Sequence, residues 1–187
     1  MTLTKQGEDK EEHQPEAVGV YPKSAILWYN KGVDLSELDR KEEALVAYDK
    51  AIEIYPNLRE AWINKGFVLN CLGRTEYALG ANEKAIEIYP NSIELWKNRG
   101  LLLELLGRAE EALLAFEKAI EINPKDGEAW INMGLDLNDL DRFEEALLAF
   151  DKAIEIDPKD DFASYVKGKA LLNNGKYEWT RKILKQQ

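Results

Sequence analysis

The sequence predicts an all-α protein, a solenoid built from antiparallel helix pairs. A proline recurs every 34 residues, apolar and small residues recur in register with it, and turn-forming residues recur between the apolar runs. The prolines of this series are Pro22, Pro56, Pro90, Pro124 and Pro158. Sequence periods of about 20 to 50 residues are typical of solenoids. Such proteins offer extended surfaces to partners instead of a single catalytic cleft.

The first helix of each 34-residue row is predicted from three columns, spaced four and three residues apart. Residues at these spacings lie on one helix face, and the glycine lets the second helix of the row approach closely. The tryptophan column holds Trp28, Trp62, Trp96 and Trp130. The glycine column holds Gly32, Gly66, Gly100, Gly134 and Gly168. The leucine column holds Leu35, Leu69, Leu103, Leu137 and Leu171.

The second helix of each row is predicted from small and aromatic columns. Two alanine columns hold Ala44, Ala78, Ala112 and Ala146, then Ala51, Ala85, Ala119 and Ala153. Between them lies an aromatic column with Tyr48, Phe116 and Phe150. Row two departs from the pattern with Gly80 and with Asn82 in place of the aromatic residue. An interior glycine costs about 1 kcal/mol and the missing aromatic loosens the contact with row three, so we predict a weak joint there.

Turn residues separate the two helices of each row. Residues suited to a left-handed helix end occupy one column: Asp39, Gly73, Gly107, Asp141 and Gly175. Candidate N-caps follow the prolines by two positions: Ser24, Ser92, Asp126 and Asp160. These residue types satisfy the free amides of a helix start, and the proline ends the preceding helix. Each row is therefore predicted to run helix, turn, helix, proline.

The columns together resemble the tetratricopeptide repeat (TPR) family, whose signature is a 34-residue helix pair with Trp, Gly, Leu, Ala, aromatic, Ala and Pro in this order. The resemblance implies a right-handed superhelix. It predicts four complete repeats over 23–158 and an incomplete fifth repeat over 159–187 that acts as a C-terminal cap. Residues 16–22 are predicted to be the remnant of a preceding repeat helix. Residues 1–15 are predicted to be a disordered polar tail.

Composition narrows the classes of function. The formal net charge is −10, which argues against nucleic acid and against anionic membrane surfaces, since both bind clustered Lys and Arg. Residues 1–15 have no apolar run of the kind found in a signal peptide, and no segment approaches the ~18 apolar residues of a membrane span. We expect a cytoplasmic protein that binds neither nucleic acid nor membrane.

Candidate catalytic groups are few. His13 is the only histidine and lies in the polar tail, where a lone ligand cannot hold a metal geometry. Cys71 has no histidine to activate it, and we expect it to be a half-buried small residue. Phosphate-binding and metalloprotease motifs are absent from the sequence. We therefore predict no enzyme activity, no metal site and no cofactor.

The candidate binding surface is the groove that the resemblance assigns to the first helices. An asparagine recurs there at Asn30, Asn64, Asn98 and Asn132. Each side-chain amide offers donors and an acceptor, so this asparagine ladder can hold the backbone of an extended peptide. The alternative is that the asparagine packs between neighbouring helices. The sequence leaves both interpretations open.

An apolar stripe and an acidic flank run beside the asparagine ladder. The apolar residues are Tyr29, Val33, Ile63, Phe67, Leu101, Ile131 and Leu135, and the acids are Glu60, Glu94 and Glu128. An exposed apolar stripe predicts a partner that buries it, unless curvature of the superhelix or the N-terminal tail covers it. The ligand is predicted to be extended, partly apolar and neutral to basic. The carboxylate clamp of chaperone-binding TPR proteins is not matched, because Tyr29, Val33 and Glu94 occupy its basic and amide positions.

Two functions follow. The first is a scaffold or adaptor that binds a protein or peptide in the groove, on the analogy of the fold. The alternative is a self-assembling structural module, a homo-oligomer that uses the ends of the solenoid. In that case Phe162, Tyr165 and Trp179 of the incomplete fifth row carry the contact.

Overall fold

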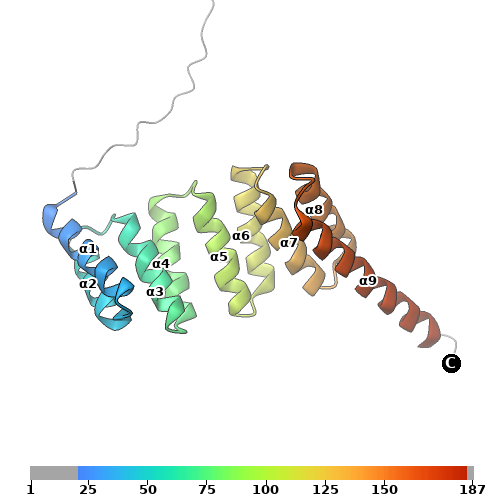
Figure 1. Ribbon diagram of the computed structural model, residues 1–187, viewed down its shortest axis with the longest axis horizontal. Helices are drawn as coiled ribbons and strands as arrows, with labels where there is room; N and C mark the ends of the chain where they lie inside the picture. Colours follow the sequence, from blue (N-terminus) through green and yellow to red (C-terminus); the bar gives the residue numbers. More distant parts are fainter. Residues whose placement is uncertain (1–20, 185–187) are drawn as a thin grey trace, which may run out of the picture.

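The structure, a computed structural model, describes residues 21–184. Nine α-helices and no strand occur within this range, in a single row (Figure 1). Their bounds are α1 Lys23–Glu37, α2 Lys41–Ile54, α3 Arg59–Cys71, α4 Thr75–Ile88, α5 Ile93–Leu105, α6 Ala109–Ile122, α7 Gly127–Asp139, α8 Phe143–Ile156 and α9 Asp161–Leu184. The predicted all-α solenoid is confirmed.

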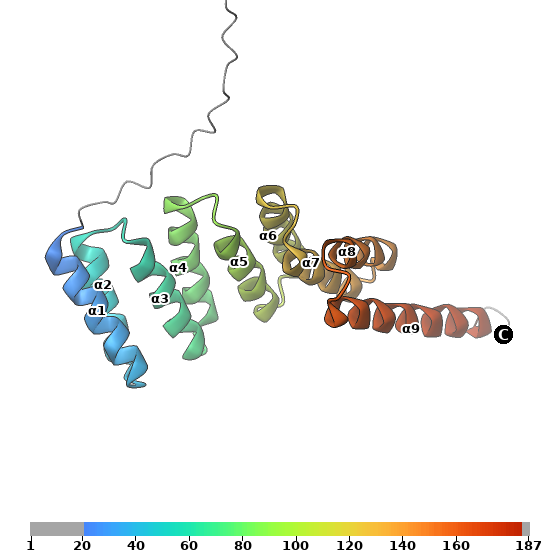
Figure 2. The same ribbon diagram turned by 45° about the horizontal axis from the view of Figure 1, so that its top comes forward.

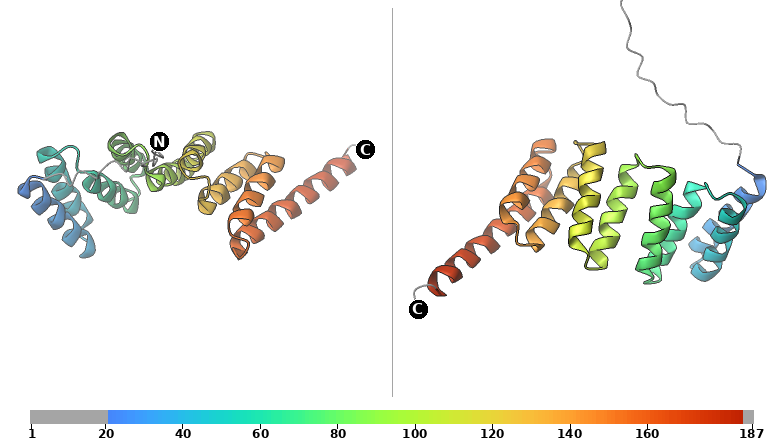
Figure 3. Two further views of the ribbon diagram at one scale, coloured as in Figure 1. Left: turned by 90° about the horizontal axis from the view of Figure 1, so that it is seen from above. Right: turned by 180° about the vertical axis from the view of Figure 1, so that it is seen from behind.

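The helices pack in chain order. Each helix contacts the next one along the chain, and α1 also contacts α3, as α7 contacts α9. The second and third views show the same succession of helix pairs (Figures 2 and 3). A stack of this kind holds together through contacts between neighbouring repeats. The inner face is the name used below for the side formed by the first helices of the pairs, α1, α3, α5 and α7.

Glycine and aromatic columns meet inside three of the four helix pairs. A Cβ built on Gly32, Gly100 or Gly134 would lie 2.5, 2.4 and 2.5 Å from the ring of Tyr48, Phe116 and Phe150, respectively. All three rings are fully buried. The ring of the second helix therefore occupies the space that the missing side chain leaves on the first helix. The sequence predicted the close approach of the two helices, with small alanines and not the rings against the glycines.

The turn and proline columns also have the predicted geometry. Asp39 and Asp141 have φ of 57° and 58°, and Gly73 and Gly107 have φ of 71° and 70°. Such left-handed residues end a helix tightly. The indole Nε1 atoms of Trp62, Trp96 and Trp130 donate to the carbonyl oxygens of Pro56, Pro90 and Pro124 at 2.8, 2.7 and 3.0 Å. These bonds fix the first helix of a row to the loop that precedes it.

Two of the four predicted N-caps form a capping bond. Asp126 accepts from the Ala129 amide at 2.8 Å, and Asp160 accepts from the Phe162 amide at 2.8 Å. Ser92 makes no side-chain capping bond. Ser24 lies inside α1, which begins at Lys23 with Pro22 as its N-cap residue.

The C-terminal row differs from the prediction. Gly175 was expected at a turn, but it lies within α9, which continues to Leu184 (Figure 1). Within the described residues the row is thus one long helix, which packs against α8 and α7 but has no second helix of its own. At the other end, Tyr21 lies edge-on to Tyr55, with ring centroids 5.4 Å apart, and Tyr21 and Pro22 are not helical. The predicted tail and the rest of the predicted remnant, residues 1–20, lie outside the described residues.

None of the described helices is long and apolar enough to cross a membrane.

Candidate functional site

A hollow of about 280 Å³ opens on the inner face between α3 and α5, with α4 at its base. We call it the socket. Among the residues that line it are Ile63, Asn64, Phe67, Asn82, Asn98 and Leu101. Five of these six belong to the asparagine ladder or to the apolar stripe predicted from the sequence. The structure therefore brings together the central part of the predicted site.

The socket exists because row two has no aromatic ring in its second helix. Asn82 stands where the other rows have Tyr48, Phe116 and Phe150, and it is 5% exposed. A Cβ built on Gly66 meets no ring: its nearest neighbours are the Ala78 carbonyl oxygen at 3.4 Å, the Ala81 Cβ at 3.5 Å and the Asn82 backbone amide nitrogen at 3.9 Å. The side-chain amide of Asn82 lines the hollow without filling it, and its Nδ2 atom donates to the Leu95 carbonyl at 3.0 Å. The sequence showed the missing ring, but we interpreted it as a weak joint and missed the hollow.

The asparagine ladder is engaged unevenly. Asn64 donates from Nδ2 to the Tyr29 hydroxyl at 3.2 Å, across the joint between α3 and α1. Asn30 and Asn98 are exposed, and Asn132 is half-buried. None of these three makes a side-chain hydrogen bond to another described residue. Packing between helices thus accounts for part of the role of Asn64, while Asn98 keeps a free amide at the edge of the socket.

The apolar stripe is most exposed around the socket. Phe67 is 66% exposed and Leu101 38%, whereas Tyr29, Val33, Ile63 and Leu135 are half-buried. Ile131 is a correction to the predicted site: it is 6% exposed and packs in the core around Phe150. Its side chain turns into the joint between repeats and therefore offers no surface to a ligand.

The acidic flank is partly neutralised by the chain itself. Glu60 pairs with Arg59 at 3.0 Å, and Glu128 pairs with Lys97 at 2.6 Å. Burial alone would lower the pKa of Lys97. Its hydrogen bonds to Glu128 and Asp126 have the larger combined effect, so the pKa is raised. Glu94 is exposed and accepts a bond from the Ser92 hydroxyl at 3.0 Å. Of the three predicted acids, Glu94 is the one whose charge meets no cation among the described residues.

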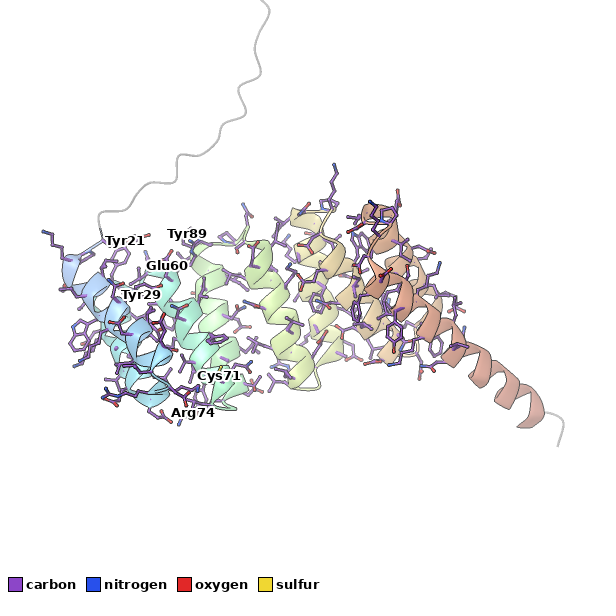
Figure 4. The ribbon with its side chains drawn as sticks, viewed as in Figure 1. Tyr21, Tyr29, Glu60, Cys71, Arg74 and Tyr89 are labelled. Carbon is purple, nitrogen blue, oxygen red and sulfur yellow. The ribbon has the colours of Figure 1, made fainter. Side chains whose placement is uncertain are left out.

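Glu60, near the start of α3, lies on the same side as Tyr21 and Tyr89, while Cys71 and Arg74 lie at the opposite end of the helix pair (Figure 4). Cys71 is exposed, which corrects the expectation of a half-buried residue. The exposure follows from its place as the last residue of α3, where no neighbouring helix covers it. Within the described residues, no group of three or more His, Cys, Asp or Glu side chains is placed to hold a metal ion.

A second hollow, of about 530 Å³, lies between α7 and α9, and Asp136 and Lys169 are among its lining residues. Asp136 is buried in the column where the other complete rows have Asp34, Val68 and Leu102. Burial, followed by the negative charge of Glu104, raises its pKa to about 8. Its Oδ2 atom has no hydrogen-bond partner. The sequence analysis did not single out this residue, although the apolar Val68 and Leu102 in the same column indicate a buried position.

Comparison with known proteins identifies the family. A tetratricopeptide repeat model matches residues 25–58, 93–126 and 127–160, and a second tetratricopeptide repeat model matches residues 149–182. The first model alone covers more than half of the 187 residues. The chain belongs to the tetratricopeptide repeat family. The matched ranges leave out 59–92, the row that lacks the aromatic ring.

Solved structures of similar shape are TPR proteins or share their fold. YrrB, described as a TPR protein with an unusual peptide-binding site, is 29% identical, with 81% of this chain and 78% of YrrB aligned and a TM-score of 0.68. A tetratricopeptide repeat protein from Parabacteroides merdae is 23% identical, over 88% of this chain and 66% of that one, with a TM-score of 0.79. MamA from Desulfovibrio magneticus RS-1 is 20% identical, over 89% and 94%, with a TM-score of 0.75. A search of curated proteins gave no match.

Proposed function

We propose that this protein is a non-catalytic interaction scaffold, which binds an extended and partly apolar peptide segment along the inner face. The observation that carries the proposal is the exposure of Phe67 and Leu101 beside the free amide of Asn98, at the edge of the socket. Large apolar side chains gathered at a hollow favour a ligand that buries them. The likeness to YrrB, whose description names a peptide-binding site, supports the same type of ligand.

The peptide chemistry follows from the side chains around the socket. Asparagine amides can donate to the carbonyls and accept from the amides of an extended backbone, and Asn98 has both groups available. Apolar side chains of the ligand then lie against the apolar stripe, centred on Phe67 and Leu101. The net charge of −10 and the unpaired Glu94 favour a neutral to basic segment, so the affinity falls as salt rises. The proposal requires no metal and no cofactor.

A peptide-display selection tests the proposal. Peptides from a random library are selected on the full chain and then measured against Asn64→Ala/Asn98→Ala. The matched control is Asn57→Ala/Asn91→Ala, which removes two asparagines from the loops between repeats. We expect the first variant to weaken binding by about 10-fold or more, since each lost hydrogen bond is worth about 1 kcal/mol, and the control to bind like the wild type. Equal binding by the wild type and both variants would show that the peptide does not bind through the inner-face asparagines, and would contradict the proposal.

Self-association is a second candidate function, because α9 has apolar side chains that its neighbours leave uncovered. Phe162, Tyr165 and Leu172 are exposed on this helix, and α9 has no second helix of its own row beside it. The side chain of Trp179, the other residue predicted for this contact, lies outside the described ones. Static light scattering over a wide concentration range tests self-association. A molar mass that rises with concentration in the wild type, but stays at the monomer value in Tyr165→Lys, would support it. A constant monomer mass excludes it.

Location in the cytoplasm and the absence of nucleic-acid and membrane partners remain predictions from the sequence.

A further inference from the structure

We propose that the socket is the anchor site of the peptide groove and that it takes an aromatic side chain of the partner, a Phe, Tyr or Trp residue. This inference rests on the proposed function and narrows the ligand to a peptide with an aromatic anchor.

The first support is the comparison among the repeats of the chain itself. In three rows the space beside the glycine of the first helix holds an aromatic ring, that of Tyr48, Phe116 or Phe150. At the corresponding place in row two, Gly66 has no ring beside it, and a Cβ built there would meet the Ala78 carbonyl oxygen, the Ala81 Cβ and the Asn82 backbone amide nitrogen at 3.4, 3.5 and 3.9 Å. The socket, which Gly66, Ala78 and Asn82 help to line, therefore lies in the helix pair that lacks the ring of the other rows. A ring delivered by a partner replaces the one that row two lacks.

The second support is the size and lining of the socket. Its volume is about 280 Å³, larger than the roughly 150 Å³ of an apolar protein cavity that binds benzene. Ile63, Phe67, Leu101 and Leu105 supply apolar walls, and Phe67 can pack edge-on against an incoming ring, an arrangement that aromatic pairs favour. Space and walls are thus sufficient for an aromatic side chain.

The third support is the position of the polar groups. Asn64 and Asn98 lie on opposite walls, on α3 and α5, so both can hold the ligand backbone next to the anchor residue. Asn82 at the base uses its Nδ2 atom for the Leu95 carbonyl, and its Oδ1 atom accepts no hydrogen bond from another described residue. A phenol or indole that enters the socket therefore meets an acceptor for its own O–H or N–H group.

The direct test uses p-cresol, the side chain of tyrosine as a free molecule, followed in ¹⁵N–¹H spectra of the full chain. We expect saturable shifts at Gly66, Asn82 and Leu101, with a dissociation constant on the order of 1 mM. The matched probe 4-methylcyclohexanol has the same skeleton without a planar ring, and we expect weaker binding. Absence of saturation with p-cresol would overturn the proposal. Equal affinity for the two probes would overturn the preference for aromatic rings.

The matched variant is Asn82→Phe, which restores the ring found in the other rows. We expect it to fold at least as stably as the wild type and to bind p-cresol at least about 10-fold more weakly. The control is Leu148→Ala, which shortens an exposed side chain of α8 that does not line the socket, and we expect it to bind p-cresol like the wild type. Unchanged p-cresol binding by a folded Asn82→Phe protein would contradict an open socket.

The peptide arm separates this inference from the proposed function. For peptides that depend on Asn64 and Asn98, replacing their aromatic residue by alanine is expected to weaken binding by about 10- to 100-fold on the wild type and to have little effect on Asn82→Phe. Peptides that depend on the two asparagines but show no such aromatic residue would refute the inference and leave the proposed function standing. If p-cresol binds saturably at the socket but no selected peptide depends on Asn64 and Asn98, the socket binds aromatic rings and the proposed peptide binding along the inner face is refuted.

Discussion

Two glycine-to-alanine substitutions, one in the row without the ring and one in a row that has it, test the packing that creates the socket. Gly66 and Gly100 are each the eighth residue of a 13-residue helix, α3 and α5. The gain in helix propensity on changing glycine to alanine, about 1 kcal/mol, is therefore the same at both positions. Any difference between the two variants must come from what the new methyl group touches.

At Gly100 the new Cβ would lie 2.4 Å from the Phe116 ring, and at Gly66 its nearest neighbour is 3.4 Å away. Overpacking of a buried site costs about 1 to 3 kcal/mol, which offsets or exceeds the propensity gain at Gly100. We expect Gly66→Ala to raise the free energy of unfolding by up to about 1 kcal/mol. We expect Gly100→Ala to leave it unchanged or to lower it by as much as about 2 kcal/mol.

Urea denaturation followed by far-UV circular dichroism measures the difference between the variants. Phe116→Asn copies row two into row three, and in this background we expect Gly100→Ala to become as favourable as Gly66→Ala. Such a double-mutant cycle isolates the contact between the methyl group and the ring. If Gly66→Ala and Gly100→Ala have equal effects in the wild-type background, the Phe116 ring does not restrict the space at Gly100, and the packing difference between rows two and three is refuted.

Three further predictions concern stability and local opening. Asp136→Leu removes a buried carboxyl with an unpartnered oxygen, and we expect it to stabilise the protein at pH 8 by about 1 to 3 kcal/mol. The pKa of this carboxyl is about 8 in the folded protein and about 4 when unfolded, so the folded state holds the extra proton. Wild-type stability should therefore fall as pH rises from about 4 to about 8. The leucine variant is expected to show a shallower fall, because only Glu104, whose pKa is also raised by burial, then contributes; parallel pH profiles of the urea midpoint would contradict this. We expect hydrogen exchange to show that residues 75–88 open first. We expect Asn82→Phe to slow the exchange of these residues. Uniform protection along the chain would contradict a weak joint between rows two and three. Trp96→Phe loses the bond to the Pro90 carbonyl, and we expect a thermal midpoint lowered by a free-energy loss of about 1 kcal/mol; an unchanged midpoint would show that the bond is not stabilising.

The repeat architecture could be predicted from the sequence because the same contacts recur in each row. The proline, glycine and aromatic columns each reflect a local contact, such as Phe116 on Gly100, that the helix period and the row length are enough to specify. The end of the chain could not be predicted in this way. An interior glycine costs only about 1 kcal/mol in a helix, so Gly175 is compatible with either a turn or a continuous α9.

The candidate site could be predicted only in part. The asparagine ladder and the apolar stripe follow from the helix period, which assigns residues to a face. Whether a residue on that face is exposed depends on the angle between neighbouring repeats, which the period does not encode. This is why Ile131 is buried and Phe67 exposed, although both belong to the predicted apolar stripe. The socket required the structure, since its volume arises from a side chain that is missing at Asn82 and from walls on two other helices.

The proposed function places peptide binding on the inner face around the socket. A ¹⁵N–¹H chemical-shift map of the full chain with a peptide selected from the random library tests this location. We expect the largest shifts at inner-face residues of α3 and α5, with Asn64, Asn98 and Leu101 among them. Shifts confined to α2, α4 and α6 away from the socket, or to α9, would contradict it.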